Sequence, residues 1–301
     1  MFTRRHPYLF FILIFTGIIS VTSISIALIS GVSEQRELKY GERVGVIELK
    51  GIILDAESAL EQLKRFREQE NVKAIVVRID TPGGAVGPAQ EIYREIRKTV
   101  AVKPVIASMG TIAASGGFYV AAATDGIMAN PGTITGSIGV IMEFTNFKEL
   151  LDKIGLYPVV IKSGEFKDLG SPVRQLSETE EAILQEFVDS VHMQFVADVA
   201  EGRGMEKDAV VQLADGRIFS GEKALALGMI DRLGNFPDAV EWAGRKGGIE
   251  GEIITVYPPE EKYSLLRKLV EMSSGEIESM LQQVNTNRIS GGYLFNPTGK
   301  R

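Results

Sequence analysis

Cysteine is absent from this chain of 301 residues, and histidine occurs only at His6 and His192. Without cysteine the protein can form no disulfide, no thiolate nucleophile and no cysteine metal site. A zinc site needs three or four nitrogen, sulfur or oxygen ligands, and one histidine outside the N-terminal segment argues against such a site. A Ser-His-Asp triad would have to use His192, which lies off the apolar face of a helix predicted over residues 177–204. We therefore interpret His192 as a histidine at the protein surface or at its boundary.

Clustered positive charge is also missing. The residues after position 33 contain 31 Lys or Arg and 39 Asp or Glu, a net charge of −8. An acidic body without a basic stripe argues against nucleic acid as a partner. The glycine-rich turn at residues 83–87 matches neither G-x-G-x-x-G nor G-x-x-x-x-G-K-[ST]. A nucleotide cofactor is therefore not expected.

The N-terminal residues 7–33 contain no charged side chain. As a helix they would be about 40 Å long, which exceeds the roughly 30 Å hydrocarbon core of a bilayer. Arg4 and Arg5 before the segment and Glu34 after it favour an N-terminus on the cytoplasmic side and a body outside. The alternative is a cleaved signal peptide, whose apolar region is usually about 7–15 residues long and ends at an A-x-A site. We expect residues 1–33 to form a cytoplasmic tip and a single transmembrane anchor.

Strands and helices alternate in the body of the chain, after a linker at residues 34–42. The first predicted elements are strands over 43–53, 72–80 and 103–110 and helices over 57–70 and 91–100. This alternation predicts an α/β layered fold with right-handed crossovers, in which sites form at the carboxyl ends of strands. We assign residues 43–258 to this domain and residues 259–301 to a C-terminal helix and tail. Later in the domain, residues 158–163 (PVVIKS) are predicted to form a strand, with a breaker-rich loop after it.

Ser115 lies in the stretch from Ala107 to Ile141, which is almost free of charge and dense in Gly, Ala, Ser and Thr. It is followed by Gly116, Gly117 and a predicted helix. A serine at the first turn of a buried helix lies where backbone N–H groups and the helix dipole can stabilise a developing negative charge. The residues themselves leave two interpretations open, a nucleophile or a simple helix cap.

A lysine or a carboxylate would have to activate this serine, because no suitable histidine is present. A lysine amine can accept the serine proton only if burial away from carboxylates lowers its pKa from about 10.4. Lys167 differs from the other lysines because it lies in the loop SGEFKDLGSP, between Phe166 and Leu169. Its neighbour Asp168 would have to point away from the amine. From spacing alone, an ordinary solvated lysine is the simpler interpretation.

Four motifs occur in one order between Arg43 and Gly248: TPGGAVGPAQEI, ASMGTIAASGGFYVAAATDGIMANPGTITGSIGVI, IKSGEFKDLGSPVRQLSETE and DGRIFSGEKALALGMIDRLG. Together they resemble the signal peptide peptidase A (protease IV) family of bacterial Ser-Lys peptidases, which is related in fold to Clp protease subunits and crotonases. The resemblance implies that Ser115 is the nucleophile and Lys167 the general base. No metal or organic cofactor is implied.

The resemblance also assigns supporting roles. It implies that the N–H groups of Gly83, Gly84 and Gly116 form the oxyanion hole, where losing one donor typically costs about 2.7–4 kcal/mol of barrier. Ser137, in TGSIG, would hold the lysine amine in place, with loop packing as the alternative. The implied fold is a layered β-α-β superhelix of the Clp protease and crotonase type.

At the level of the assembly, the resemblance implies a closed homo-oligomeric ring in the bacterial cytoplasmic membrane. Each site would combine Ser115 of one subunit with Lys167 of its neighbour. The substrates would be remnants of cleaved signal peptides and other apolar, unfolded peptides. The alternatives are a crotonase-like acyl-CoA enzyme on the same fold and a catalytically inactive membrane scaffold.

The C-terminal tail carries the apolar triplet Tyr293-Leu294-Phe295. One hypothesis is that it enters a subunit's binding groove as an extended strand and acts as a self-ligand. The alternative is a tail that packs elsewhere on the surface or stays disordered.

Overall fold

The computed structural model describes residues 41–259, the strand at residues 292–294, and residues 8, 15–17, 19–21 and 24 near the N-terminus. The chain divides into two compact units, residues 1–42 and 43–301. Most of the predicted anchor, the linker and the predicted C-terminal helix lie outside the described residues. Among the residues that are described, no helix combines the length and the apolar character needed to cross a membrane.

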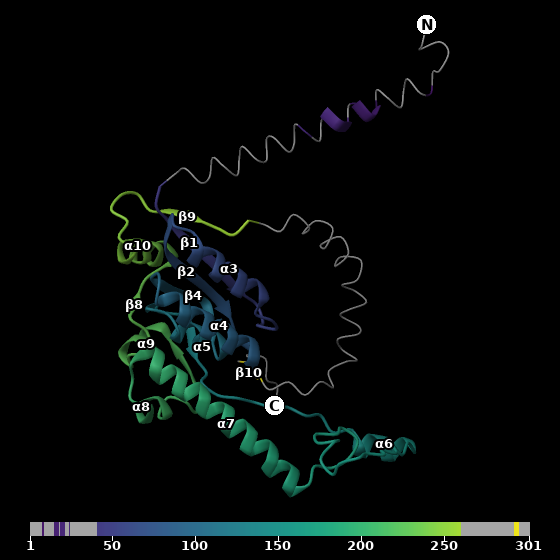
Figure 1. Ribbon diagram of the computed structural model, residues 1–301. Helices are drawn as coiled ribbons and strands as arrows, with labels where there is room; N and C mark the ends of the chain where they lie inside the picture. The colour runs from purple at the N-terminus through teal and green to yellow at the C-terminus, as the bar shows by residue number, and fades with distance from the viewer. Residues whose placement is uncertain are drawn as a thin grey trace. The chain divides into compact units, whose positions relative to one another are not determined.

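The second unit is built on one mainly parallel sheet, ordered β7-β6-β4-β2-β1-β9, with β5 paired to β4 and β8 paired to β5 (Figure 1). Only the β6–β7 pair in this sheet is antiparallel. The strands are β1 (Arg43–Lys50), β2 (Val72–Thr81), β4 (Val105–Ala114), β5 (Gly126–Ala129), β6 (Ile134–Gly136), β7 (Ile218–Ser220), β8 (Arg232–Leu233) and β9 (Ile254–Val256). The first three predicted strands are thus confirmed as β1, β2 and β4.

Helices cover both faces of the sheet. Alternate side chains of a strand point to opposite faces, and in β2 the side chains of Ile75 and Val77 join one apolar cluster while those of Ala74 and Val76 join the other. The helices are α3 (Glu57–Glu68), α4 (Val86–Val100), α5 (Gly116–Ala122), α7 (Glu178–Arg203), α8 (Lys207–Val211), α9 (Gly221–Ala226) and α10 (Phe236–Lys246). Figure 1 shows α10 on one side of the sheet and α3 with α4 on the other. The predicted α/β layered fold is confirmed.

Residues 142–176, which we call the arm, extend from the body in Figure 1 and carry the helix α6 (Lys148–Ile154). None of these residues is buried. The predicted strand at residues 158–163 is wrong, because this segment forms no strand and pairs with none of the described residues. Its three consecutive apolar side chains, Val159, Val160 and Ile161, are exposed instead, with Ile161 95% accessible. An extended segment without a partner gains no sheet hydrogen bonds, so its β propensity alone does not produce a strand.

Candidate active site

Ser115 follows β4 and begins α5 in a strained backbone conformation, with φ 54° and ψ −118°. A non-glycine residue held in such a region costs roughly 1–3 kcal/mol and typically occurs at a functional site. The Ser115 N–H donates to the Gly136 carbonyl at 2.8 Å, and the residue is 1% exposed. Its side chain makes no capping hydrogen bond to α5. The simple helix cap therefore does not explain this serine, and its hydroxyl group is available for chemistry.

Ser137 lies next to Ser115 because β4 and β6 run parallel and pair Ala114 with Gly136. Each strand therefore ends with a serine at the carboxyl edge of the sheet. Ser137 also has a left-handed backbone, with φ 52°, and its N–H donates to the Arg217 carbonyl at 2.8 Å. Two serines with strained backbones therefore lie side by side at the carboxyl edge of the sheet.

The short strand β3 (Gly83–Ala85) lies against Ile53 along one side. The Ile53 N–H donates to the Gly83 carbonyl at 2.9 Å, and the Ala85 N–H donates to the Ile53 carbonyl at 2.8 Å. A Cβ atom on Gly84 would lie 2.1 Å from the Ile53 oxygen, so only glycine permits this approach. Because N–H groups alternate along a strand, the Gly84 N–H faces the opposite edge.

The other two glycines assigned to the oxyanion hole differ from each other. The Gly83 N–H donates to the Thr81 hydroxyl oxygen at 3.1 Å and is already engaged. Gly116 is the first residue of α5, where backbone N–H groups have no partner within the helix. Of the predicted three, the Gly116 N–H therefore lies at the open first turn of α5, and the Gly84 N–H faces the outer edge of β3.

The C-terminal strand β10 (Gly292–Leu294) pairs with the outer edge of β3 in antiparallel register. Tyr293 lies opposite Gly84, and Leu294 lies opposite Gly83. The strand also contacts α5, which lies close to it in Figure 1. Residues 292–294 thus form the extended strand of the tail hypothesis, and its role as a self-ligand stays a prediction.

Lys167 lies in the arm and is exposed. Its backbone N–H donates to the Gly164 carbonyl at 3.2 Å. Within the described part of the chain, no hydrogen bond or ion pair joins its side chain to Ser115. The structure therefore brings together Ser115, Ser137, Gly84 and Gly116 but not Lys167, and the Ser-Lys pair stays a prediction.

The carboxylate of Asp168, the neighbour of Lys167, contacts two cations. Its oxygens accept hydrogen bonds from Arg174 Nε at 2.8 Å and Arg174 Nη2 at 3.0 Å, and from Lys162 Nζ. The Arg174 guanidinium, followed by Lys162, holds the pKa of Asp168 well below its usual range. A basic role for Lys167 requires the Asp168 carboxylate to point away from the lysine amine. In this loop the carboxylate is directed to Arg174 and Lys162 instead.

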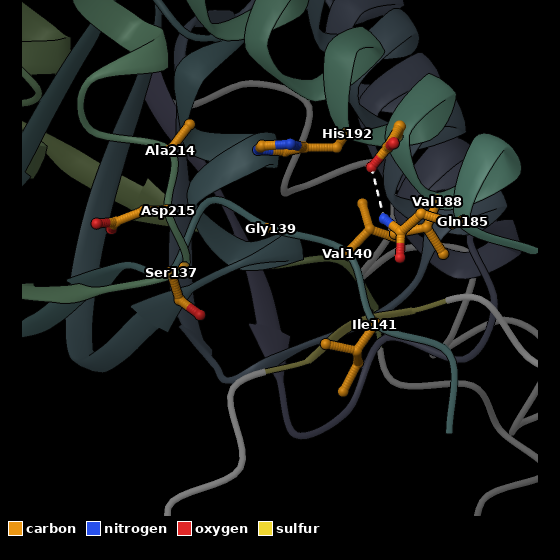
Figure 2. Close-up of a pocket in the computed structure, with 11 residues that line it drawn as sticks. Ser137, Gly139, Val140, Ile141, Gln185, Val188, His192, Ala214 and Asp215 are labelled. Carbon is orange, nitrogen blue, oxygen red and sulfur yellow. Dashed lines mark hydrogen bonds between the residues drawn. The ribbon is translucent and has the colours of Figure 1, made fainter. Parts of the chain in front are cut away.

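A cavity of about 450 Å³ opens beside Ser137 (Figure 2). His192 lines it from α7, and its Nε2 atom is buried without a hydrogen-bond partner among the described residues. On the same helix the Gln185 amide donates to Asp189 at 2.7 Å, the dashed line in Figure 2. The half-buried position of His192 agrees with the boundary location that the sequence suggested, but the cavity itself was missed. The spacing of residues 185, 188, 189 and 192 along one helix face was the available signal.

A mainly parallel α/β sheet with a strained serine at its carboxyl edge is the arrangement expected of a serine peptidase with a Clp-protease-like fold. In agreement, the family model for Clp protease matches residues 44–134. The model for peptidase family S49 matches residues 97–250, about half of the chain. The chain belongs to peptidase family S49.

Relatives from several organisms share this similarity. A candidate protease of Synechocystis sp. is 43% identical over 76% of this chain and 83% of its own length. A candidate signal peptide peptidase SppA of Enterococcus faecium is 41% identical over 60% of this chain and 53% of its own. The chloroplastic serine protease SPPA of Arabidopsis thaliana is 34% identical over 68% and 30%, respectively. Among solved structures, the 1510-N membrane-bound stomatin-specific protease, as a mutant, aligns over 74% of this chain and 100% of its own, with 19% identity and a TM-score of 0.48.

Proposed function

We propose that the protein is a membrane-anchored serine endopeptidase in which Lys167 of one subunit activates Ser115 of a neighbour. One observation carries the proposal: Ser115 is strained, buried and not used as a cap, while Lys167 is exposed on the arm. A lysine can accept the serine proton only as a neutral amine. A neighbouring copy that covers the arm would bury the amine and favour its neutral form.

The reaction follows from these positions. The neutral Lys167 amine takes the hydroxyl proton while the Ser115 oxygen attacks the scissile carbonyl carbon. The N–H groups of Gly84 and Gly116 stabilise the oxyanion, and the Lys167 ammonium returns its proton to the leaving amine. Water then hydrolyses the acyl-enzyme, with Lys167 again as the base. The Ser137 hydroxyl is proposed to hold the amine close to Ser115.

The proposed substrate is an extended, apolar peptide such as a signal-peptide remnant. The support is the outer edge of β3, which accepts an antiparallel strand opposite Gly84. Strand addition gives affinity through main-chain bonds and requires an unfolded segment. We also propose that residues 7–33 anchor the chain in the bacterial cytoplasmic membrane, N-terminus inside, because this segment is uncharged and follows two arginines.

Mixing two inactive variants tests the shared site. The full-length chain in detergent is assayed for peptide hydrolysis as wild type, as Ser115→Ala, as Lys167→Ala, and with the two variants co-expressed in equal amounts. Both single variants should be inactive. Random assembly combines an intact serine with a neighbour's intact lysine in about one quarter of the sites, so the mixture should regain about that fraction of the activity. No recovery in assembled mixtures would contradict sharing between subunits, and activity in Lys167→Ala would contradict the Ser-Lys mechanism itself.

The strand β10 allows a second test, which concerns the proposal that substrate binds along the outer edge of β3. Deleting residues 291–301 should raise kcat/KM for a short peptide, because the tail occupies the edge of β3 that the substrate would use. Changing Tyr293 and Leu294 to Gly should have a similar, smaller effect. An unchanged rate in both variants would show that the tail does not compete with substrate.

A further inference from the structure

Arg174 lies between two carboxylates at the point where the arm joins α7. Its Nε and Nη2 atoms donate to the two oxygens of Asp168, at 2.8 and 3.0 Å. Its Nη1 atom donates to Glu180 at 2.7 Å, and Nη2 also contacts Glu180. Planar guanidinium groups suit such paired contacts because their N–H groups match the spacing of carboxylate oxygens. One side chain therefore joins the residue after Lys167 to the start of α7.

The α7 end of this connection is rigid. Glu180 is the third residue of the helix, and its carboxylate accepts hydrogen bonds from the Ser177 N–H at 3.0 Å and the Ser177 hydroxyl at 3.1 Å. In return the Ser177 hydroxyl accepts from the Glu180 N–H, which completes a capping box. The Glu180 side chain is only 5% exposed. Arg174 is thus fixed to the first turn of a 26-residue helix.

At the other end of this connection, in the loop, Arg174 contacts both the side chain and the backbone of Asp168. Arg174 Nη2 donates to the Asp168 main-chain carbonyl at 3.1 Å, and the same carbonyl accepts from the Ser171 N–H at 3.0 Å. The charged groups that contact Asp168 are Arg174 and Lys162. The charged groups that contact Arg174 are Asp168 and Glu180. The amine of Lys167 is absent from this network.

We propose that Arg174 is a positioning residue for Lys167, which holds the Asp168 carboxylate away from the lysine amine so that this amine can lose its charge. The inference rests on the proposed role of Lys167 as the base. If Arg174 is removed, the carboxylate next in the chain is free to pair with Lys167. A carboxylate in contact with an ammonium group favours the charged form and raises the pKa of the amine. Less of the base is then neutral at a given pH.

The test is the pH dependence of kcat/KM, measured for the full-length assembled protein with a short peptide. Activity in the wild type should rise with pH as the base loses its proton. This rise is the acidic limb of the pH profile. Arg174→Gln should move this limb to higher pH by about one unit, which is a tenfold loss of activity on the acidic side. Asp168→Asn should leave the limb near its wild-type position. The double variant Arg174→Gln/Asp168→Asn should return it there, because the competing carboxylate is gone.

A purely structural role predicts a different pattern. Loss of loop structure would lower kcat at every pH, leave the limb in place, and gain nothing from Asp168→Asn. That pattern would overturn the inference. Should Arg174→Gln fail to fold, Lys162→Gln removes the other cation from Asp168 and should move the limb in the same direction by less. An unmoved limb there would also overturn it. Full activity of Lys167→Ala would instead refute the proposed function, whichever way the Arg174 variants behave.

Discussion

At the residue scale, the carboxyl edge of the sheet contains backbone conformations that few side chains tolerate. Ser115 and Ser137 are the only non-glycine residues with positive φ in the described part of the chain. Both follow adjacent parallel strands, so the sheet register fixes both main chains. Strain of this kind persists only where the surroundings over-determine the conformation. Here the hydrogen bonds from Ser115 to Gly136 and from Ser137 to Arg217 provide that constraint.

Replacing Gly84 with Ala should disable the oxyanion hole. The added Cβ would lie 2.1 Å from the Ile53 oxygen, so β3 must move and the Gly84 N–H must move with it. We expect kcat to fall by about 10²–10³, the usual cost of one lost oxyanion donor. Gly87→Ala is the matched control, because a Cβ there meets nothing within 4 Å. Steady-state peptide hydrolysis by both variants checks this, and equal activities would contradict the assignment of Gly84.

Single residues were predictable from sequence only where local rules identify them. The position of Ser115 before two glycines and a short helix was enough to suggest a nucleophile. Gly83 and Gly84 look alike in sequence, but in the structure the Gly83 N–H donates to the Thr81 hydroxyl, whereas Gly84 lies opposite Tyr293 of β10. The position of Lys167 in a breaker-rich loop made it a candidate, but only the family resemblance favoured a base over a solvated lysine. The cavity beside His192 was missed because its walls come from three segments far apart in the chain.

At the element scale, the short helix α5 is held by a buried polar network rather than by its own length. Seven residues form only about two turns, which are not stable alone. The Tyr119 hydroxyl donates to the Asp198 carboxylate of α7, and the Tyr93 hydroxyl of α4 donates to the Asp198 carbonyl at 2.7 Å. Burial, with the nearby Asp198 charge, raises the pKa of Tyr93 to about 12. This network connects the helix that carries the Gly116 N–H to two longer helices.

Tyr119→Phe should loosen this connection. The change leaves the buried Asp198 carboxylate with Arg94, at 2.9 Å, but without the phenol. We expect a loss of about 1.5–3 kcal/mol in the free energy of unfolding, as for a hydrogen bond to a charged group. A fall in kcat should accompany it because α5 shifts. Tyr257→Phe, at an exposed tyrosine, is the control. Urea unfolding of both variants checks the prediction, and equal midpoints would mean that Asp198 finds another partner.

The start of α7 should respond to acid. Arg174, followed by the Ser177 N–H, lowers the pKa of Glu180 from 4.5 to about 2. A carboxyl group with a lowered folded-state pKa stabilises the native state above its unfolded pKa, and this contribution is lost as pH falls through the folded value. The wild type should therefore lose stability between pH 4.5 and about 2. Glu180→Gln should lose less over the same interval, whereas Glu178→Gln, in the same turn, should behave as wild type. Urea midpoints across this range measure the difference.

Elements were predictable where one segment carries its own pattern. The apolar strands β1, β2 and β4 and the capping box of α7 are visible in the sequence because their signals are local. The segment at residues 158–163 is also apolar and β-branched but forms no strand, because a strand also needs a neighbour to pair with. The pairing of β10 with β3 joins residues about 200 positions apart. Only the apolar triplet hinted at it, and its register could not be read from sequence.

At the scale of the whole molecule, the arm presents an apolar surface that one chain does not cover. Tyr157, Val159 and Ile161 are 78%, 86% and 95% exposed. Exposed apolar patches on a folded protein mark interaction surfaces or aggregation sites. The same arm carries the proposed base, which must be buried to act. A second copy covering the arm would bury the apolar side chains and the lysine together.

Ile161→Glu should therefore disrupt the assembly of subunits while leaving the folding of each chain intact. The side chain is 95% exposed, so the substitution should change the free energy of unfolding of one chain by no more than about 0.5 kcal/mol. A charge at this position would have to be desolvated in a subunit contact, which is costly without a partner. We expect sedimentation in detergent to show smaller species, and peptidase activity to fall at least tenfold. Val102→Glu, at an exposed turn outside the arm, should change neither property. An Ile161→Glu protein that stays assembled and active would remove the arm from the interface and leave the source of the base unexplained.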